Sequence, residues 1–416
     1  MVDLEKLGKN AQAAAAQLAQ LPTAIKNKAL VQMAADLRNN KEEIIAVNKE
    51  DLKQAKENKA PEKFMDRLMI DDKRIESMAS GLEKVASLPD PIGNVDKGWI
   101  NHAGLKIEKR RVPLGVIGMI YEARPNVTVD ATALCFKAGN AVILRGGKEA
   151  LQTNIKLAQI LRQTLADQDL DPNMVQIITE TSHELADKFM QLTDYLDVLI
   201  PRGSSRLIQA VVKNASVPVI ETGAGNCHIY VDDDADKQMA VDIVTNAKCQ
   251  RPSVCNAAEK LVISSKCAEE ILPAIADSLI KHGVQIRGDE RARKILGDKA
   301  VPASAADWDT EYDDYIIAVK VVDSLDEAIQ HINAHSTKHS ESIITNNYSH
   351  SEKFLNEIQS ACVYVNASTR FTDGGEFGFG AEIGISTQKL HARGPMGLNE
   401  LTTTKYAIHG SGQVRE

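Results

Sequence analysis

Cys255 is the residue of this sequence best suited to nucleophilic chemistry. It ends the segment QRPSVC, which follows a predicted helix, and Lys248 and Arg251 are close to it in the chain. Positive charge beside a cysteine favours the thiolate, which is the form that attacks a carbonyl carbon. The competing interpretation is a small buried hydrophobic residue, the commoner state of a single free cysteine. We expect that buried state for Cys135, Cys227, Cys267 and Cys362.

A second candidate for chemistry is the segment PRGSSR at 201–206, which joins a predicted strand ending at Ile200 to an apolar-periodic helix beginning near Leu207. A helix amino terminus presents free backbone N–H groups and a positive dipole end, and both favour a bound phosphate. An ordinary N-cap by Ser204 is the competing interpretation. The sequence has neither a G-x-G-x-x-G fingerprint after a strand nor a P-loop.

The spacing of the histidines and of the clustered aspartates argues against a metal site. There is no H-E-x-x-H motif, and His331 and His335 lack the glutamate that a zinc protease helix needs. We expect these two histidines and His339 to lie on a solvated face. Asp232–Asp234 is interpreted as the cap of a following helix rather than as a cation site.

The elements that must position these residues begin with helices. Residues 4–88 place Leu, Ile and Met at helical spacing between charged faces. From Gly98 to Val112, apolar residues alternate with basic ones, which predicts a two-stranded ribbon of the kind used in assembly. The tail after Gly394 has no helical stripe, so we expect it to return as a strand to this ribbon or to a partner subunit.

Two later stretches predict α/β architecture, because short β-rich runs alternate with helical segments as in βαβ units around a parallel sheet. The strands expected in the first stretch are Val116–Ile120, Ala141–Leu144, Val175–Ile178, Val198–Ile200 and Val217–Ile220. The strands expected in the second are Leu261–Ile263, Ile316–Val322, Ser342–Thr345 and Val363–Asn366.

Length and composition fit a folded chain of two or three domains. The 416 residues exceed a single domain of roughly 100–200 residues. A hydrophobic content of 43% excludes general disorder, and a net charge of −8 argues against a nucleic-acid partner. No secretory signal and no apolar run near the ~20 residues that span a bilayer occur, so we expect a cytoplasmic protein without a membrane partner.

Taken together, these segments resemble the aldehyde dehydrogenase superfamily, and most closely its glutamate-5-semialdehyde dehydrogenase branch. The motifs that carry the resemblance are VPLGVIG (112–118), YEARPN (121–126), KAGN (137–140), PRGS (201–204), ETG (221–223) and QRPSVC (250–255). The second and the last of them point to this branch in particular.

The resemblance implies an α/β, aldehyde dehydrogenase-like fold with two doubly wound α/β domains and a small β oligomerisation arm. The cofactor-binding domain would span 1–97 and 113–226, the catalytic domain 227–390, and the arm 98–112 and 391–416. A homodimer or a higher homo-oligomer is expected.

The activity that the resemblance implies is NADPH-dependent reduction of L-glutamate 5-phosphate to L-glutamate 5-semialdehyde and phosphate, through a cysteine thioester, in proline biosynthesis. A functional coupling to the glutamate 5-kinase that supplies this labile small-molecule substrate is a further expectation. Two alternatives stay open. One is an aldehyde-oxidising dehydrogenase of the same superfamily, and the other is a non-catalytic binding or assembly protein that retains the fold.

The resemblance also implies roles for individual residues. Cys255 would be the nucleophile, Asn126 and the backbone N–H of Cys255 would hold the oxyanion, and Glu221 would transfer a proton or position a group. The expected NADPH contacts are Arg145 and Lys148 near the adenosine ribose and its 2′-phosphate, Ser204 at the pyrophosphate and Glu311 at the nicotinamide ribose. The candidates for holding the carboxylate or phosphate of the substrate are Arg124, Arg251 and Arg370.

Overall fold

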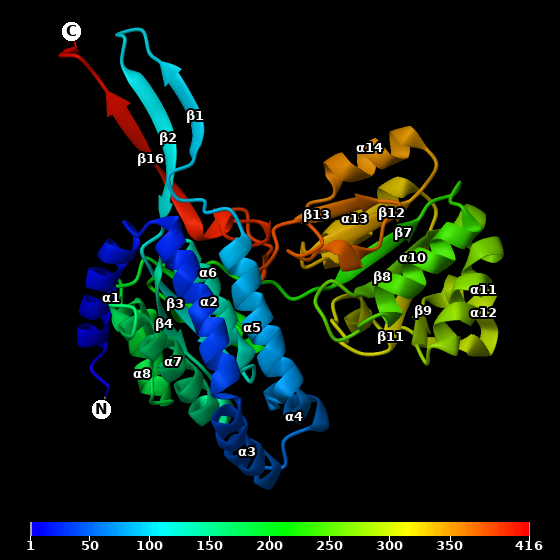
Figure 1. The fold of residues 1–416 in the computed structure, drawn as a ribbon. Coiled ribbons are helices and arrows are strands. Elements are labelled where there is room, and N and C mark those ends of the chain that lie inside the picture. Colours follow the sequence, from blue (N-terminus) through cyan, green and yellow to red (C-terminus); the bar gives the residue numbers. More distant parts are fainter. Residues whose placement is uncertain (1, 416) are drawn as a thin grey trace. The chain divides into compact units, whose positions relative to one another are not determined.

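The structure is a computed structural model that describes residues 2–415. The chain divides into two compact units. Unit 1 consists of Met1–Glu221, Gly378–Gly384 and Met396–Glu416, and unit 2 consists of Thr222–Phe377 and Ile385–Pro395. Each unit contains a parallel β-sheet with helices packed against it (Figure 1).

A four-stranded parallel sheet in the order β5-β4-β3-β6 forms the centre of unit 1. Its strands are β3 (Val116–Tyr121), β4 (Ala141–Arg145), β5 (Val175–Ile177) and β6 (Val198–Arg202). Every residue of β3 is buried, because a parallel sheet is covered on both faces, and this is why such strands are continuous apolar runs in the sequence.

One of the strands expected in unit 1 is wrong. Val217–Ile220 makes only an isolated bridge, between Leu199 and Val219, rather than a full strand. Pro218 lies inside this run and has no backbone N–H, so the run cannot form a regular ladder.

Helices surround the sheet of unit 1, and the first five confirm the helical prediction for residues 4–88. Helix α1 begins after Asp3, whose side chain accepts a hydrogen bond from the backbone N–H of Lys6. The helices of unit 1 are α1 (Leu4–Leu18), α2 (Thr23–Asn39), α3 (Lys41–Glu57), α4 (Glu62–Leu68), α5 (Asp72–Ser87), α6 (Asn126–Lys137), α7 (Leu151–Ala166), α8 (His183–Met190) and α9 (Ser205–Asn214).

The KAGN motif at 137–140 has a structural role at the end of α6. Asn140 Oδ1 accepts a hydrogen bond of 2.9 Å from the backbone N–H of Gly115, and Asn140 Nδ2 donates one of 2.8 Å to the carbonyl oxygen of Leu401. Gly139 has a φ of +81°, and a Cβ there would come within 2.7 Å of Pro113 Cγ. The motif therefore joins the sheet to the strand that ends the chain.

An antiparallel three-stranded sheet projects from unit 1 (Figure 1). Its strands are β1 (Val95–Ile100), β2 (Lys106–Pro113) and β16 (Thr402–His409), with β2 in the centre. Because β16 pairs with β2 along its whole length, the predicted return of the tail to the ribbon is confirmed. We call this sheet the arm.

Unit 2 contains a seven-stranded parallel sheet in the order β10-β9-β11-β8-β7-β12-β13. Its strands are β7 (Cys227–Val231), β8 (Ala258–Ser264), β9 (Gln285–Gly288), β10 (Ala300–Pro302), β11 (Ile316–Val322), β12 (Ser340–Ile344) and β13 (Cys362–Val365). Its helices are α10 (Lys237–Cys249), α11 (Ser265–Lys281), α12 (Glu290–Leu296), α13 (Leu325–His335) and α14 (Tyr348–Glu357). A short antiparallel pair, β14 (Ile385–Ser386) and β15 (Gly394–Pro395), completes the unit.

The expected fold class is confirmed by these two α/β units and by the β-arm. Within the part of the chain that the structure describes, no helix combines the length and the apolar character that a membrane span requires.

The aspartate cluster of unit 2 does not cap α10 as predicted. The cap is Asp236, whose side chain accepts a hydrogen bond from the backbone N–H of Met239. Asp232 instead lies at the end of β7, where its carboxylate accepts from Thr345 Oγ1 and lies 2.6 Å from Nδ1 of His350. The sequence interpretation was wrong because Asp232 and Asp234 accept from Thr345 at the end of a neighbouring strand and Asp233 pairs with Lys266, so none of the three caps the helix that follows.

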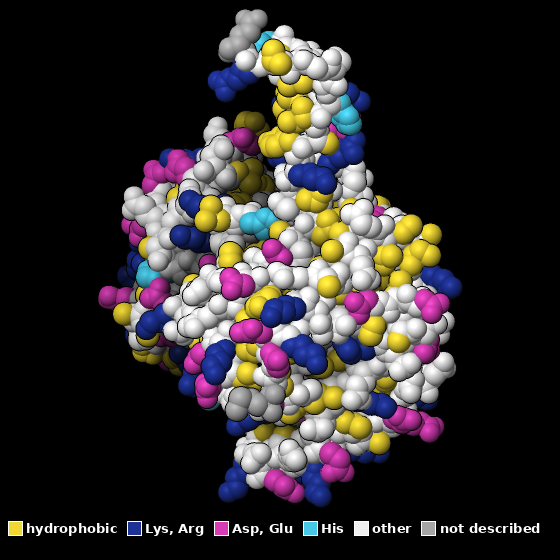
Figure 2. Space-filling model, turned by 90° about the vertical axis from the view of Figure 1, so that its left-hand side faces the viewer, with side chains coloured by type: hydrophobic (Ala, Val, Ile, Leu, Met, Phe, Trp, Pro, Cys, Tyr) yellow, Lys and Arg dark blue, Asp and Glu magenta, His cyan; other side chains and the backbone are white. Residues whose placement is uncertain are grey.

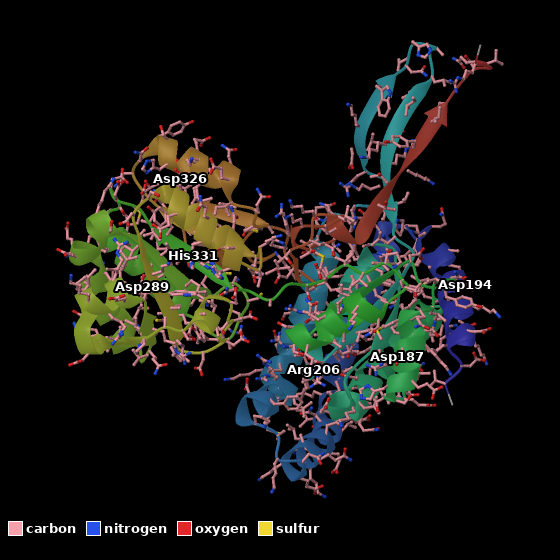
Figure 3. The ribbon with its side chains drawn as sticks, turned by 180° about the vertical axis from the view of Figure 1, so that it is seen from behind. Asp187, Asp194, Arg206, Asp289, Asp326 and His331 are labelled. Carbon is pink, nitrogen blue, oxygen red and sulfur yellow. The ribbon has the colours of Figure 1, made fainter. Side chains whose placement is uncertain are left out.

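The prediction of a solvated face is wrong for His339 and His331, whereas the side chain of His335 is partly exposed, with its Nδ1 2.7 Å from Asp309 Oδ1. His339 is fully buried, and its Nδ1 lies 2.8 Å from the hydroxyl of Ser340. His331, on α13 (Figure 3), packs edge-on against Trp308 with 5.3 Å between ring centroids, and burial lowers its pKa to about 3. The face of α13 that bears His331 thus packs against protein rather than water.

Candidate active-site residues

Cys255 lies on the loop between α10 and β8, and its side chain is half-buried. Cys249 is the other half-buried cysteine among the described residues. The remaining four are buried, as predicted. A nucleophile must be reached by its substrate, so exposure leaves Cys255 and Cys249 as the candidates. Burial raises the pKa of Cys249, which disfavours its thiolate.

The backbone of Cys255 packs closely against Gly225 and Cys227, where the chain leads into β7. We call this pair of contacts the cradle. A Cβ built on Gly225 would overlap the carbonyl oxygen of Cys255, so only glycine fits at this position. The thiol of Cys227 donates a hydrogen bond of 3.2 Å to the same carbonyl oxygen. Burial holds the pKa of Cys227 well above its usual value, so this thiol keeps the proton that it donates.

The two ends of the Cys255 loop are tied together by a buried ion pair. Lys248 Nζ, in the last turn of α10, lies 3.1 Å from Glu259 Oε2 on β8, and both side chains are at most 1% exposed. Burial lowers the pKa of Lys248 and raises that of Glu259. The ammonium of Lys248, which the sequence analysis considered as a positive charge near Cys255, is thus paired with Glu259.

Arg370 reaches the Cys255 loop from more than a hundred residues away in the chain. Its Nε donates a hydrogen bond of 3.0 Å to Gln250 Oε1, and its Nη1 donates to Asn256 Oδ1. Asn256 Nδ2 donates in turn to the carbonyl oxygen of Thr372, at 2.9 Å. Burial lowers the pKa of Arg370, and the positive charge of Arg251 lowers it further. The structure thus gathers two of the three predicted arginines around Cys255.

Glu311 lies close to the same cradle. Its Oε1 accepts a hydrogen bond of 2.6 Å from the backbone N–H of Gly225, the glycine that contacts Cys255. Burial raises the pKa of Glu311, and the nearby charge of Asp313 raises it further. In this structure Glu311 therefore supports the backbone beneath the loop of Cys255.

In unit 1, Asn126 is the first residue of α6, one residue after the buried Pro125. Its Nδ2 donates a hydrogen bond of 2.8 Å to Oδ2 of Asp130, one turn along the same helix. Arg124 is half-buried and precedes this helix, and the adjacent Ala123 has a φ of +41°. The strained turn at 123 brings the YEARPN motif round from β3 into α6.

Ser204 is the N-cap of α9, and its hydroxyl accepts a hydrogen bond of 3.3 Å from the backbone N–H of Leu207. The structure thus contains the N-cap of the competing interpretation. The backbone N–H of Ser204 itself donates to the carboxylate of Glu122, at 2.8 Å. Gly203 is exposed, and a Cβ there would come within 2.6 Å of Glu122 Oε2. The backbone N–H of Ser204, predicted to face a phosphate, is therefore engaged by Glu122 in this structure.

Arg145 is the last residue of β4, and Lys148 follows it by three residues. Arg145 is half-buried, and its Nε is buried without a hydrogen-bond partner among the described residues. Burial lowers the pKa of Arg145, and the charge of Asp187 on α8 (Figure 3) opposes this shift. Lys148 is exposed in a short turn of helix at Lys148–Ala150. An unsatisfied guanidinium nitrogen, followed three residues later by an exposed ammonium, suits a ligand that offers oxygen acceptors.

Glu221 is the last residue of unit 1 and is half-buried. It directly follows Ile220, whose backbone N–H donates a hydrogen bond of 2.9 Å to the carbonyl oxygen of Leu199 on β6. The backbone before Glu221 is therefore attached to the sheet of unit 1.

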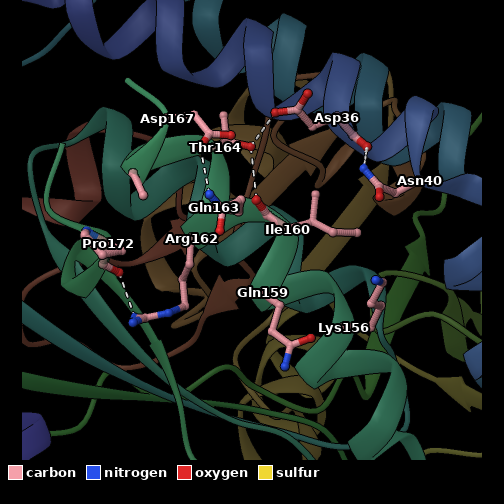
Figure 4. Close-up of a pocket in the computed structure, with 11 residues that line it drawn as sticks. Asp36, Asn40, Lys156, Gln159, Ile160, Arg162, Gln163, Thr164, Asp167 and Pro172 are labelled. Carbon is pink, nitrogen blue, oxygen red and sulfur yellow. Dashed lines mark hydrogen bonds between the residues drawn. The ribbon is translucent and has the colours of Figure 1, made fainter. Parts of the chain in front are cut away.

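A polar pocket of about 620 Å³ lies elsewhere in unit 1, along α7 and the end of α2 (Figure 4). Its polar groups bond to one another: Thr164 Oγ1 donates to Asp36 Oδ2 at 2.7 Å, and Arg162 donates to the carbonyl oxygen of Pro172 at 2.7 Å. It contains none of the site residues predicted from the sequence, so it is separate from the candidate active-site residues.

Several residues beside the predicted ones were missed by the sequence analysis. Asp130 had a usable signal, since an acid four residues after Asn126 faces it on a helix. Gly225, Cys227 and Glu122 had none, because their contacts with Cys255 and Ser204 join segments that are at least 28 residues apart.

Comparisons with known proteins agree with this architecture. A model of the aldehyde dehydrogenase family matches residues 2–292 and 300–407. The gamma-glutamyl phosphate reductase of Ligilactobacillus salivarius is 67% identical over 415 residues, covering 100% of both chains. The protein of the same name from Enterococcus faecalis is 58% identical over 415 residues, covering 100% of this chain and 99% of the relative.

Solved structures point the same way. The crystal structure of gamma-glutamyl phosphate reductase from Thermotoga maritima matches with a TM-score of 0.98 and 50% identity over 100% of both chains. An acetylating aldehyde dehydrogenase from Geobacillus thermoglucosidasius has a TM-score of 0.68 at 14% identity, over 99% of this chain and 97% of that one, and so shares the fold. The predicted resemblance to the glutamate-5-semialdehyde dehydrogenase branch, whose other name these relatives carry, is confirmed. The chain belongs to the aldehyde dehydrogenase family.

Proposed function

We propose that this chain reduces L-glutamate 5-phosphate to L-glutamate 5-semialdehyde and phosphate with NADPH, in proline biosynthesis, and that Cys255 is the nucleophile. The observation that carries the proposal is a half-buried Cys255, held by its backbone, in a chain 67% identical to a named gamma-glutamyl phosphate reductase. Coupling to the kinase that makes the labile substrate stays a prediction.

The first proposed step is attack of the Cys255 thiolate on the carbonyl carbon of the acyl phosphate. The new C–S bond forms as the C–O bond to phosphate breaks, so inorganic phosphate leaves with the electron pair and a thioester remains on Cys255. A reduced nicotinamide cofactor, when bound, supplies the hydride that lowers this carbonyl to the aldehyde oxidation level. Breaking of the C–S bond then returns the thiolate of Cys255 and releases the aldehyde.

Negative charge gathers on the substrate oxygen in each tetrahedral state. We assign Asn126 Nδ2 and the backbone N–H of Cys255 as the donors that stabilise it, and one such donor typically lowers the barrier by ~3–4 kcal/mol. The cradle of Gly225 and Cys227 supports this role, because a fixed Cys255 backbone costs little reorganisation during the reaction.

The proposed substrate is an anion, and positively charged arginine side chains are suited to binding it. Arg370 is oriented by Gln250 and Asn256 on either side of Cys255, and Arg251 belongs to the same loop. We propose that these two, with Arg124 of unit 1, hold the carboxylate and the phosphate of glutamate 5-phosphate. Glu221 is proposed to transfer a proton or to position a group.

The residues of unit 1 fit a nicotinamide cofactor. The buried Nε of Arg145 lacks a partner among the described residues, and the backbone N–H of Ser204 at the start of α9 donates to a carboxylate oxygen of Glu122, which a pyrophosphate would replace. Arg145 and Lys148 would hold the adenosine ribose and its 2′-phosphate, and Ser204 would hold the pyrophosphate. Glu311 is proposed to contact the nicotinamide ribose through its second carboxylate oxygen, since the first is bonded to Gly225.

Replacing Lys148 by glutamate tests the preference for NADPH. The expected result is a Kd for NADPH higher by about tenfold or more with a Kd for NADH within about twofold of its original value, since a hydrogen bond to a charged group is worth roughly 1.5–3 kcal/mol and every 1.4 kcal/mol is about tenfold. Titration of dinucleotide fluorescence measures both. Lys213→Glu, at the exposed last turn of α9, is the matched control. An equal loss for both dinucleotides would contradict the assignment of Lys148.

One assay separates the proposed function from its two alternatives. Glutamate 5-semialdehyde should reduce NADP⁺ only when inorganic phosphate is present, because the reverse reaction must form the acyl phosphate. Reduction without phosphate would favour an aldehyde-oxidising dehydrogenase. No reduction with either NADP⁺ or NAD⁺ would favour a non-catalytic protein that retains the fold.

We also propose that the arm joins copies of this chain. Trp99 and Ile408 both pair with Ile107 across the three strands, so these side chains lie on one face together with Tyr406. Tyr406 and Ile408 are 59% and 57% exposed, and the rings of Trp99 and Tyr406 lie 6.1 Å apart. Figure 2 shows apolar side chains along the arm. Exposed apolar surface of this kind favours a protein partner.

A charge on this face of the arm is expected to break the assembly. Ile408→Lys should lower the mass measured by light scattering to that of a smaller species, because burying an unpaired ammonium is costly. His409→Lys places the same side chain on the opposite face of β16 and should leave the mass unchanged. A mass unaffected by Ile408→Lys would remove this face from the interface.

A further inference from the structure

We infer that Asp130 is a positioning residue that fixes the side-chain amide of Asn126 in the orientation needed to stabilise the oxyanion. The inference rests on the proposed function and adds to it a residue that the sequence analysis did not select. Asp130 is not assigned any contact with substrate or cofactor.

The two side chains meet on a rigid helix. Asn126 and Asp130 are one turn apart on α6, and Nδ2 of Asn126 donates to Oδ2 of Asp130 at 2.8 Å. The helix around them is buried from Val127 to Val129 and from Ala131 to Lys137. Thr128, between them, shares a hydrogen bond of 2.6 Å with the hydroxyl of the buried Tyr121. The backbone that carries Asp130 is therefore held in place by packing.

An ionised carboxylate selects one of the two orientations of an amide. The Asn126 side chain has an accepting oxygen at one end and a donating nitrogen at the other, and a half-turn of the amide exchanges them. An ionised Asp130 only accepts hydrogen bonds, so it must face the nitrogen. The same nitrogen carries a second N–H, which is the donor that an oxyanion requires. In the opposite orientation Asn126 would present its oxygen and repel the oxyanion.

The protonation state of Asp130 controls this selection. Burial raises its pKa to about 6, although the hydrogen bond from Asn126 and the positive field of Arg202 on β6 both lower it. Below pH 6 the acid becomes protonated and is able to donate a hydrogen bond, so either end of the amide can face it. Orientation of Asn126 is therefore secured above pH 6 and lost below it.

A purely structural role is the rival explanation, because a bond between residues i and i+4 also stabilises a helix. The structure offers a matched control for it. In α10, Gln238 Nε2 donates a hydrogen bond of 2.9 Å to Asp242 Oδ1, again at i and i+4. Asp242→Asn makes the same substitution in the same kind of bond on an exposed helix face, and we expect it to leave kcat unchanged.

A double-mutant cycle tests the inference with phosphate-dependent NADP⁺ reduction by glutamate 5-semialdehyde as the assay. Asn126→Ala should lower kcat by about 10²–10³-fold, as for loss of an oxyanion donor. Asp130→Asn is nearly isosteric and neutral, and we expect it to lower kcat about tenfold with KM within about twofold. In the Asn126→Ala background, Asp130→Asn should change kcat less than about twofold, since there is no amide left to orient.

Equal effects of Asp130→Asn in the two backgrounds would overturn the inference, and so would an Asn126→Ala variant with normal kcat. The wild-type chain supplies a test that needs no variant to fold: kcat should fall as pH drops through about 6, and a kcat constant from pH 7 to 5 would overturn the inference. Absence of phosphate-dependent activity in the wild-type chain at every pH would instead reject the proposed function, which keeps the two failures distinct.

Discussion

Cys255→Ser is expected to abolish phosphate-dependent NADP⁺ reduction, with a loss of about 10⁴-fold or more in kcat. A serine hydroxyl keeps the shape of the side chain, but at neutral pH it has almost no ionised form with which to attack a carbonyl carbon. Cys255 is half-buried and its backbone carries the main contacts with Gly225 and Cys227. The melting temperature should therefore stay close to that of the wild-type chain.

Cys249→Ser is the matched control for this substitution. Cys249 is the other half-buried cysteine among the described residues, and it lies only six positions earlier in the chain. We expect its replacement to change kcat less than about twofold. Alkylation by iodoacetamide, followed by peptide mass spectrometry, should label Cys255 faster than Cys249. Normal turnover by Cys255→Ser would remove this cysteine from the mechanism, whatever the behaviour of Cys249→Ser.

Gly225→Ala is expected to lower kcat by about 100-fold or more without touching any reacting atom. The new Cβ would overlap the carbonyl oxygen of Cys255, which belongs to the backbone and cannot rotate aside like the end of a side chain. The Cys255 loop must then move, and a misplacement of about 1 Å can cost 10²-fold in rate. Overpacking should also destabilise unit 2, typically by about 1–3 kcal/mol.

Gly81→Ala separates this effect from the general consequence of replacing glycine. Gly81 lies inside α5, and a Cβ there meets no atom within 4 Å. Its replacement should leave kcat unchanged and stabilise the helix by roughly 0.5–1 kcal/mol. Steady-state kinetics and thermal melting measure both variants. A Gly225→Ala chain with wild-type kcat would show that the position of the Cys255 backbone does not limit the reaction.

The predictable parts of the fold are helices and strands whose formation depends only on residues within one short segment of the sequence. Strand β11 was predicted with its observed bounds, Ile316–Val322, because an apolar run of that length between polar segments reports burial on both faces. The N-cap at Ser204 was one of two interpretations considered, because a residue with a hydroxyl side chain directly precedes a predicted helix. Val217–Ile220 was predicted from its apolar residues alone, and the prediction failed because Pro218 within it has no backbone N–H to donate to a ladder.

The environment of the candidate nucleophile was less predictable. Lys248 precedes Cys255 by seven residues, yet its charge is paired with Glu259 on the strand that follows the loop. Arg370 contacts Gln250 and Asn256 across at least 114 residues of chain. Residue type and spacing do not predict such pairings, because the pairings depend on which strands become neighbours in the sheet.

The sequence by itself determined the order of the helices and strands and the motifs that place this chain in its family, since these depend on residues near one another along the chain. Only the tertiary structure decided that Gly225 and Cys227 hold the backbone of Cys255, that Glu122 bonds to Ser204 and that His339 is buried. The physical reason is that hydrogen bonds and close packing act over a few ångströms in space, and folding alone brings distant segments within that range.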